Sequence, residues 1–309
     1  MQSIQIAKDY SNGTIDQLRS GLTELSSKYH NATVVVVGSL ARREASRESD
    51  IDYFTIIDGE DEYPALMEDV GKIVERLGLK PPSSNGAFAA VVRRSNFLAS
   101  IGGGDETNAD LTRRMLYLLE SDWLMGGNLY QTILESIIKD YISDNITQHQ
   151  LAKFFLNDLI RYYRTVCVDF EYKTAGSKKS WGDRNIKLLF SRKLMYFSGV
   201  LAAAETAQSS AEVKKSELAR ILALSPYDRL IEICGSDARK SLDFYDQFLG
   251  WMADPSRREL LRGTSPIRED QTEAFREMKN VAHHFSWSLQ SLFLRTYPPS
   301  HPIHQALML

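Results

Sequence analysis

The sequence has few cysteines, no long apolar run and no signature of secretion. Only two of its 309 residues are cysteine, Cys167 and Cys234, and both lie in apolar segments with a helical pattern. Such thiols are typical of reduced, buried side chains in a cytoplasmic protein rather than of a disulfide or metal site. No stretch reaches the roughly 18–20 apolar residues of a membrane span, and the N-terminus lacks the charged and apolar regions of a secretory signal. We therefore expect a cytoplasmic protein with no membrane partner.

An excess of charge is also missing. The formal net charge of −3 gives no general attraction to polyanions, so an RNA partner would need a local basic patch. The length of 309 residues is enough for one large domain or two ordinary ones.

The second half of the chain lacks strand-like segments. Residues 33–37, 50–57 and 88–92 are short and rich in apolar side chains, which predicts strands, whereas residues 5–30 and 64–77 have helical patterns. From Leu129 onward every long segment has a helical pattern. These features predict an α+β (mixed) fold: a small mixed β-sheet core with flanking helices in residues 1–128, followed by an all-α domain in residues 129–309.

One stretch near the N-terminus combines apolar strands with unusual polar residues. Four valines at positions 34–37 lead into Gly38-Ser39, and Asp50 and Asp52 follow within the next apolar run. Glycine permits a sharp turn, and a short helix predicted from Leu40 to about Ala45 would direct its N–H groups at that turn, which suits a phosphate. Two carboxylates on one strand face repel each other without a cation, and Mg²⁺ prefers such oxygen ligands.

A second informative segment contains three consecutive glycines at positions 102–104. It is followed by Asp105 and by Thr107 and Asp110, whose spacing predicts a capping box. The helix that begins there is expected to end near Gly126. The glycine segment is either a flexible connection or a mobile loop over a site, and the second interpretation is slightly favoured.

The residues of the first stretch resemble the signature of the polymerase-β-like nucleotidyltransferase superfamily. The similarity lies in Gly38-Ser39, in Arg42 and Glu44, and in residues 49–53. Residues 108–114 and 119–121 resemble the bacterial branch that contains the nitrogen-regulatory uridylyltransferase and its uncharacterised relatives, in which a helical substrate-binding domain follows the catalytic one. Residues 157–164 and 181–187 are similar to that second domain.

The resemblance implies an enzyme that moves a nucleoside monophosphate from a nucleoside triphosphate to a hydroxyl group, with release of pyrophosphate. Asp50 and Asp52 would be catalytic and hold two Mg²⁺ ions, and Gly38 and Ser39 would bind the β- and γ-phosphates. The acceptor would be a protein or a small molecule. Two alternatives stay open: an RNA-directed, toxin-like transferase, which the net charge disfavours, and a nucleotide-binding regulatory protein with degraded catalysis.

The superfamily also implies a third carboxylate on a later strand, and the segment at 88–92 has no acid. The nearest acids are Asp105, Glu106 and Asp110, and Asp105 is the preferred candidate because Asp110 already has a role as a helix cap.

Basic residues of the first helix turn and of the helical half are candidate phosphate ligands. The set consists of Arg42, Arg161, Arg184 and Lys187. The competing interpretation is a solvated helix face with internal ion pairs, which is the usual explanation of a charge run. For Arg42 the two interpretations are balanced, and for the other three the functional one is slightly favoured.

Overall fold

The computed structural model describes residues 1–60, 63–82, 91–99, 101–175 and 180–308. These residues form two compact units. The sheet unit comprises Ile6–Thr147 and Ser210–Ser225, and the helical unit comprises Met1–Gln5, Gln148–Ser209 and Pro226–Leu309. Among the described residues, no helix is long and apolar enough to cross a membrane.

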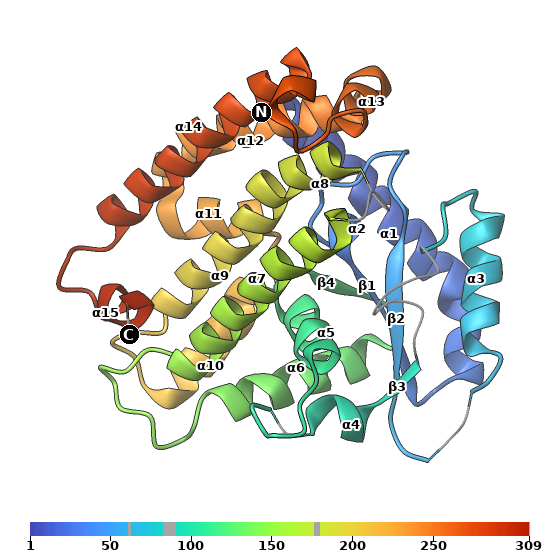
Figure 1. Cartoon of the computed structure of the whole chain (residues 1–309). Helices are drawn as coiled ribbons and strands as arrows, with labels where there is room; N and C mark the ends of the chain where they lie inside the picture. The colour runs from blue at the N-terminus through green and yellow to red at the C-terminus, as the bar shows by residue number, and fades with distance from the viewer. Residues whose placement is uncertain (61–62, 83–90, 100, 176–179, 309) are drawn as a thin grey trace. The chain divides into compact units, whose positions relative to one another are not determined.

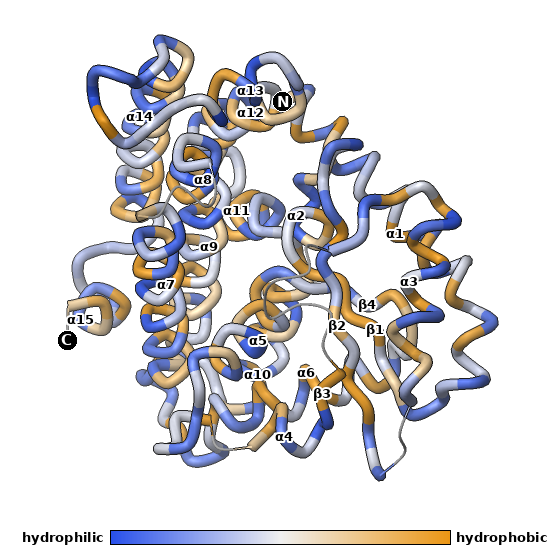
Figure 2. Tube along the Cα trace, turned by 45° about the vertical axis from the view of Figure 1, so that its right-hand side comes forward, coloured by the Kyte–Doolittle hydropathy of each residue, from blue (hydrophilic) through white to orange (hydrophobic). Residues whose placement is uncertain are grey.

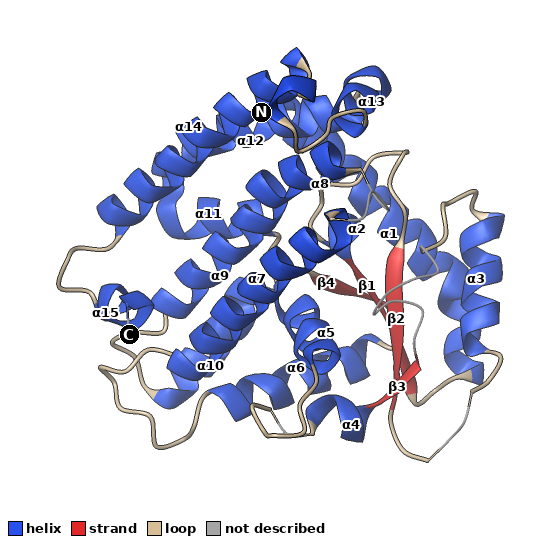
Figure 3. Cartoon of the chain, in the orientation of Figure 1, coloured by secondary structure: helices blue, strands red, loops and turns tan. Residues whose placement is uncertain are grey.

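The sheet unit is built on four strands in the order β3-β2-β1-β4. The central strand β1 (Ala32–Val37) pairs antiparallel with β2 (Asp52–Ile57) and β4 (Ser121–Met125), and β2 pairs in parallel with β3 (Val91–Arg93). Every residue of β1 is buried, as expected for β-branched side chains covered on both faces. Figure 3 shows these four strands in red, and Figure 2 shows the apolar colour that runs along β1 and β2. The predicted mixed sheet is confirmed.

Helices cover both faces of the sheet (Figure 1). On one face, α1 (Gln2–Lys28) and α3 (Leu66–Arg76) pack their apolar residues against β1 and β2 in a single buried cluster. The other face is covered by further helices, and there Phe97 of α4 lies between Phe54 of β2 and Tyr117 of α5. The helices on that side are α4 (Arg94–Leu98), α5 (Asn108–Leu119) and α6 (Gly127–Tyr141), with α10 (Ala211–Leu222) packed on α6.

Strand β4 corrects the helix that the sequence predicts up to Gly126. Helix α5 begins at the expected capping box of Thr107 and Asp110 but ends at Leu119, and the chain then pairs with β1. The segment Ser121–Met125 contains no β-branched residue and a single aromatic one, Trp123, so its strand conformation depends mainly on pairing with β1. At its end Gly126 has a φ of 70°, and a Cβ there would overlap the backbone oxygen of Ala32.

The described residues of the helical unit contain helices and no strand, as predicted for this half of the chain. Its central helix is α9 (Lys193–Ala204), which is buried along nearly its whole length. A stack of three rings, Phe190 between Phe248 and Phe285, holds the neighbouring helices together. The elements are α7 (Lys153–Thr174), α8 (Trp181–Lys187), a π-helical turn (Leu188–Arg192), α9, α11 (Pro226–Cys234), α12 (Arg239–Ala253), α13 (Pro255–Arg262), α14 (Glu273–Thr296) and α15 (Pro302–Met308), with short 3₁₀ turns at Gly235–Ala238 and Arg268–Asp270.

The compact units divide the chain differently from the predicted ranges 1–128 and 129–309. Helix α6 and the separate segment Ser210–Ser225 belong to the sheet unit. A division of function at residue 128 stays a prediction.

Candidate active site

The two aspartates lie at the beginning of β2, on either side of a buried residue. Asp52 is the first residue of β2 and is half-buried. Asp50 is exposed, and its backbone forms an isolated parallel β-bridge with that of Lys80. Between them Ile51 is 3% exposed, and its N–H donates to the carbonyl of Lys80 at 2.9 Å. Burial of the Ile51 side chain and its backbone hydrogen bond to Lys80 therefore hold this segment in place. The two aspartates lie at the N-terminal end of β2.

The antiparallel pairing of β1 and β2 brings the Gly-Ser turn to these carboxylates. Val37, the last residue of β1, is paired with Asp52, and Gly38 follows directly. Gly38 has a φ of 74°, and a Cβ at this position would stand 3.1 Å from Oδ2 of Asp52. The missing side chain thus allows the turn to approach the carboxylate closely, and the structure brings together Gly38 and Asp52, two of the predicted site residues.

Helix α2 (Gly38–Ala41) is only four residues long, so the predicted helix to about Ala45 is too long. Arg42 caps it and Arg43 adopts a φ of 64°, which turns the chain away. Ser39 is half-buried at the first turn. Because a single turn has a small dipole, the affinity of this turn for a phosphate would depend on its individual N–H groups.

The predicted phosphate ligand Arg42 lies inside the protein. Its side chain is 7% exposed, its Nε donates to Glu44 at 2.9 Å, and its Nη1 pairs with Glu120, whose side chain is fully buried. A guanidinium held by two buried carboxylates is suited to positioning the turn. Direct contact of Arg42 with a phosphate stays a prediction.

The three acids considered for the third carboxylate have different surroundings. Asp105 is exposed in the turn before α5. Glu106 is buried and pairs with Arg114 at 2.5 Å, and Asp110 completes the capping box with Thr107. Of these acids, only Asp105 has its carboxylate in solvent and outside such a structural pair. Its assignment to the site stays a prediction.

The donor set at the sheet edge is compatible with a hard divalent cation. Mg²⁺ is commonly held by one or two carboxylates, with substrate phosphates and water completing its coordination. Asp52 supplies one such group beside the turn, and Asp50 supplies another two residues earlier. Within the described ranges, no group of three or more His, Cys, Asp or Glu side chains is placed to hold a metal.

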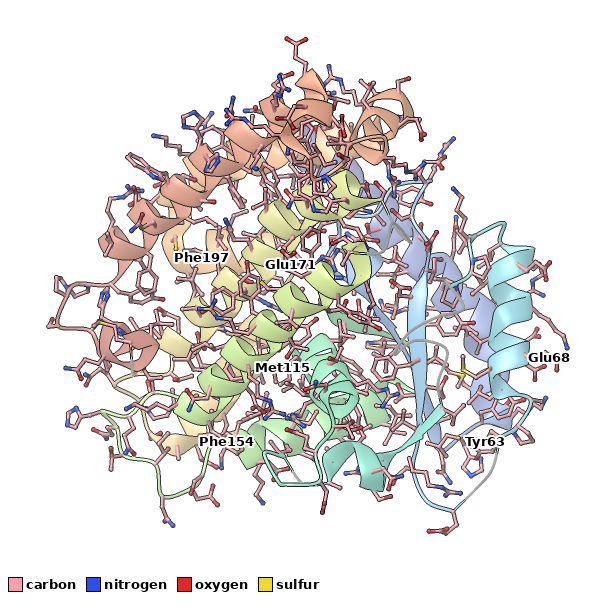
Figure 4. All side chains as sticks on the ribbon, viewed as in Figure 1. Tyr63, Glu68, Met115, Phe154, Glu171 and Phe197 are labelled. Atoms are coloured by element: carbon pink, nitrogen blue, oxygen red, sulfur yellow. The ribbon has the colours of Figure 1, made fainter. Side chains whose placement is uncertain are left out.

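The predicted basic residues of the helical unit lie on α7 and α8. Arg161 pairs with Asp158 at 3.2 Å and Lys187 with Asp183 at 2.8 Å, and both cationic side chains remain about 40% exposed. Arg184 is half-buried, and no described residue forms an ion pair or hydrogen bond with its side chain. In Figure 4 the labelled Phe154 and Glu171 mark the two ends of α7. The role of these three cations at a phosphate stays a prediction.

Two long-range ion-pair groups of the sheet unit escape sequence analysis. Arg42 meets Glu120 across 78 positions of the chain, and Arg43 donates to Asp122 at 2.6 Å across 79 positions. No local spacing could reveal these pairs, because they depend on the pairing of β4 with β1.

The sheet unit carries a Gly-Ser turn against one of two aspartates that are separated by a single residue. Residues 16–85, which contain these features, match the family model of the nucleotidyltransferase domain. The match begins within α1, at residue 16, and includes the turn and both aspartates. The protein is therefore a transferase enzyme, and its domain is of the kind that transfers nucleoside monophosphates from nucleoside triphosphates. No curated protein matches the sequence.

Proposed function

We propose that the protein is a Mg²⁺-dependent nucleotidyltransferase that modifies a hydroxyl group of a protein or small molecule in the cytoplasm. The observation that carries the proposal is the approach of the Gly38 backbone to the Asp52 carboxylate, which would put a bound triphosphate next to a metal ligand. Both cysteines are free thiols, in keeping with a reducing compartment.

The binding step would use the turn and the cations. Gly38 and Ser39 would receive the β- and γ-phosphates. Asp50 and Asp52 would hold the metal, which supplies neutralisation of charge on the phosphates when bound. Arg161, Arg184 and Lys187 are the proposed additional phosphate ligands. Arg161 and Lys187 each pair with an acid on the same helix, and their own side chains stay about 40% exposed, which leaves them accessible to a ligand.

The transfer step would form one bond and break one. The acceptor oxygen bonds to the α-phosphorus, the bond from the α-phosphorus to the bridging oxygen breaks, and pyrophosphate leaves. The hydroxyl proton passes to a carboxylate, for which Asp105 is the proposed base. Beyond this proton transfer, the chain contributes mainly positioning and electrostatic stabilisation.

A transfer assay tests the proposal. The protein is incubated with Mg²⁺ and each of the four α-³²P-labelled triphosphates, with and without cell lysate, and label is followed on protein, small molecules and RNA. We expect label on a protein or small molecule and a loss of at least about 1,000-fold in Asp52→Asn and Asp50→Asn, since an essential metal ligand contributes several kcal/mol. In the same assay, Asp105→Asn should lower the rate about 100-fold if it is the base.

The matched control is Asp58→Asn, because Asp58 lies just beyond the other end of β2 and pairs with Arg94 at the surface. It should transfer at the wild-type rate. Label on RNA alone would instead support the RNA-directed alternative, and triphosphate binding without transfer would support the regulatory one. Full transfer by Asp52→Asn would contradict the metal assignment.

A further inference from the structure

Two consecutive arginines follow the Gly-Ser turn, and two acids from a distant segment meet them. Arg42 and Arg43 end the α2 turn, and Glu120 and Asp122 lie at the beginning of β4. The strand pairing explains the meeting, because Val37 is opposite Ser121 and Val36 is opposite Asp122. Each arginine is held by one of the acids.

The inner pair is buried on both sides. Glu120 is fully buried, Arg42 is 7% exposed, and Glu44 adds a second carboxylate that is 3% exposed. Removal of one partner from such a group leaves an uncompensated buried charge, so the group has a single favourable arrangement.

The outer pair restrains an unfavourable backbone. Arg43 has a φ of 64°, a conformation that costs a residue with a side chain about 1–2 kcal/mol. Its guanidinium donates to Asp122 at 2.6 Å and to the carbonyl of Ala41 at 3.0 Å. Arg19 of α1 donates to the second oxygen of Asp122 at 2.7 Å. One carboxylate therefore links the turn to both β4 and α1.

Main-chain hydrogen bonds connect these arginines to the turn itself. The N–H of Arg42 donates to the carbonyl of Gly38 at 2.9 Å, and the N–H of Glu44 donates to that of Ser39 at 2.9 Å. A displacement of residues 42–44 would therefore displace both residues of the turn.

We infer that Glu120 and Asp122 are positioning residues that hold the Gly38-Ser39 turn in its phosphate-binding conformation. The inference rests on the proposed function and names a further part of the same site. We call Arg42, Arg43, Glu44, Glu120 and Asp122 the carboxylate clamp. Glu120 and Asp122 act through the backbone of the turn, so their loss should affect binding of the β- and γ-phosphates and leave binding of the nucleoside monophosphate part of the substrate unaffected.

Binding measurements separate this role from general stability. Calorimetry measures how tightly wild type, Glu120→Gln and Asp122→Asn bind nucleotides in the presence of Mg²⁺. The nucleotides are the non-hydrolysable α,β-methylene triphosphates of the four bases and the four nucleoside monophosphates. We expect about tenfold weaker binding of the preferred triphosphate, as for other residues that support a ligand-binding group, and unchanged binding of the monophosphate.

The chain offers a matched control in Glu106→Gln. Glu106 is also a buried acid of the sheet unit, is 2% exposed and is paired with Arg114, but it supports α5 and not the turn. It should lower the Tm about as much as Glu120→Gln and leave both affinities unchanged. Should Glu120→Gln fail to fold, Asp122→Asn carries the test, because Asp122 is 18% exposed.

Two results overturn the inference. One is wild-type triphosphate binding by Asp122→Asn or by folded Glu120→Gln; the other is an equal loss of triphosphate and monophosphate binding in either variant, which would indicate a merely structural role. Failure of the proposed function looks different, since wild-type protein would then transfer no label at all. A wild type that binds no triphosphate would overturn both.

Discussion

The two units of the protein hold their cationic side chains in contrasting ways. Near the Gly-Ser turn of the sheet unit, arginines are paired over 78 or more positions of sequence with acids that are mostly buried. On α7 and α8 of the helical unit, Arg161 and Lys187 pair with acids three or four residues away and stay about 40% exposed. The comparison teaches which cations can meet a ligand: a cation whose own side chain is exposed is accessible to one, whereas a cation in a buried, long-range pair is part of the fold.

The largest expected effect tests the fixed side of this comparison. Arg42→Ala should lower the free energy of unfolding by about 3–5 kcal/mol, because Glu44 and Glu120 would be left buried without their cation. Chemical denaturation measures the change. In the control Lys173→Ala, an exposed helical-unit pair with Asp169 is lost and the change should stay within about 0.5 kcal/mol. Equal changes in the two variants would erase the distinction between the units.

The next largest effect tests whether activity depends on the close approach of Gly38 to Asp52. Gly38→Ala should lower kcat/KM about 100-fold, equivalent to about 2.7 kcal/mol, because the new Cβ would combine a positive φ with a 3.1 Å contact to the Asp52 carboxylate. Gly59→Ala is the control: Gly59 has a φ of 86° and no atom within 4 Å of an added Cβ. It should cost stability and keep the activity. If Gly38→Ala keeps the wild-type kcat/KM, the turn is not part of the active site.

The smallest expected effect tests whether an accessible cation of the helical unit binds a phosphate. Arg184→Ala should weaken triphosphate binding about tenfold, about 1.4 kcal/mol, with the Tm almost unchanged, since no described residue pairs with Arg184. Calorimetric titration with a non-hydrolysable triphosphate and thermal unfolding measure the two quantities. Arg262→Ala, which removes an exposed Arg262–Glu259 pair elsewhere in the helical unit, should change neither. Unaltered affinity in Arg184→Ala would exclude this arginine from the phosphate ligands.

The sequence predicts the parts of the fold that depend on local pattern. The run of valines specifies β1, the capping box of Thr107 and Asp110 begins α5, and the neighbouring strands β1 and β2 bring Gly38 to Asp52. Each of these features lies within about twenty residues of its partner. The helical second half is predicted for the same reason, because its apolar periodicity is local.

The remaining features depend on tertiary pairing. Strand β4 has a weak local strand preference, and its pairing with β1 brings Glu120 and Asp122 to the arginines. The role of Arg42 as a phosphate ligand stays a prediction, but its burial against Glu120, 78 positions away, leaves no trace in the residues around it. Similarly, the membership of Ser210–Ser225 in the sheet unit follows from the packing of α10 on α6 and from the pairing of Lys215 with Asp144.

Helix α10 completes the sheet unit but is synthesised long after the rest of that unit. A ribosome that has released residues 1–147 has delivered the strands, the aspartates and the turn, but not α10, so the apolar side of α6 that α10 covers would wait for another sixty or so residues at about 5–20 residues per second. During that interval the nascent sheet unit would expose the apolar surface of α6 to other proteins. A protein expressed only to residue 147 would keep that surface permanently, which makes it a candidate for chaperone retention and not a minimal enzyme.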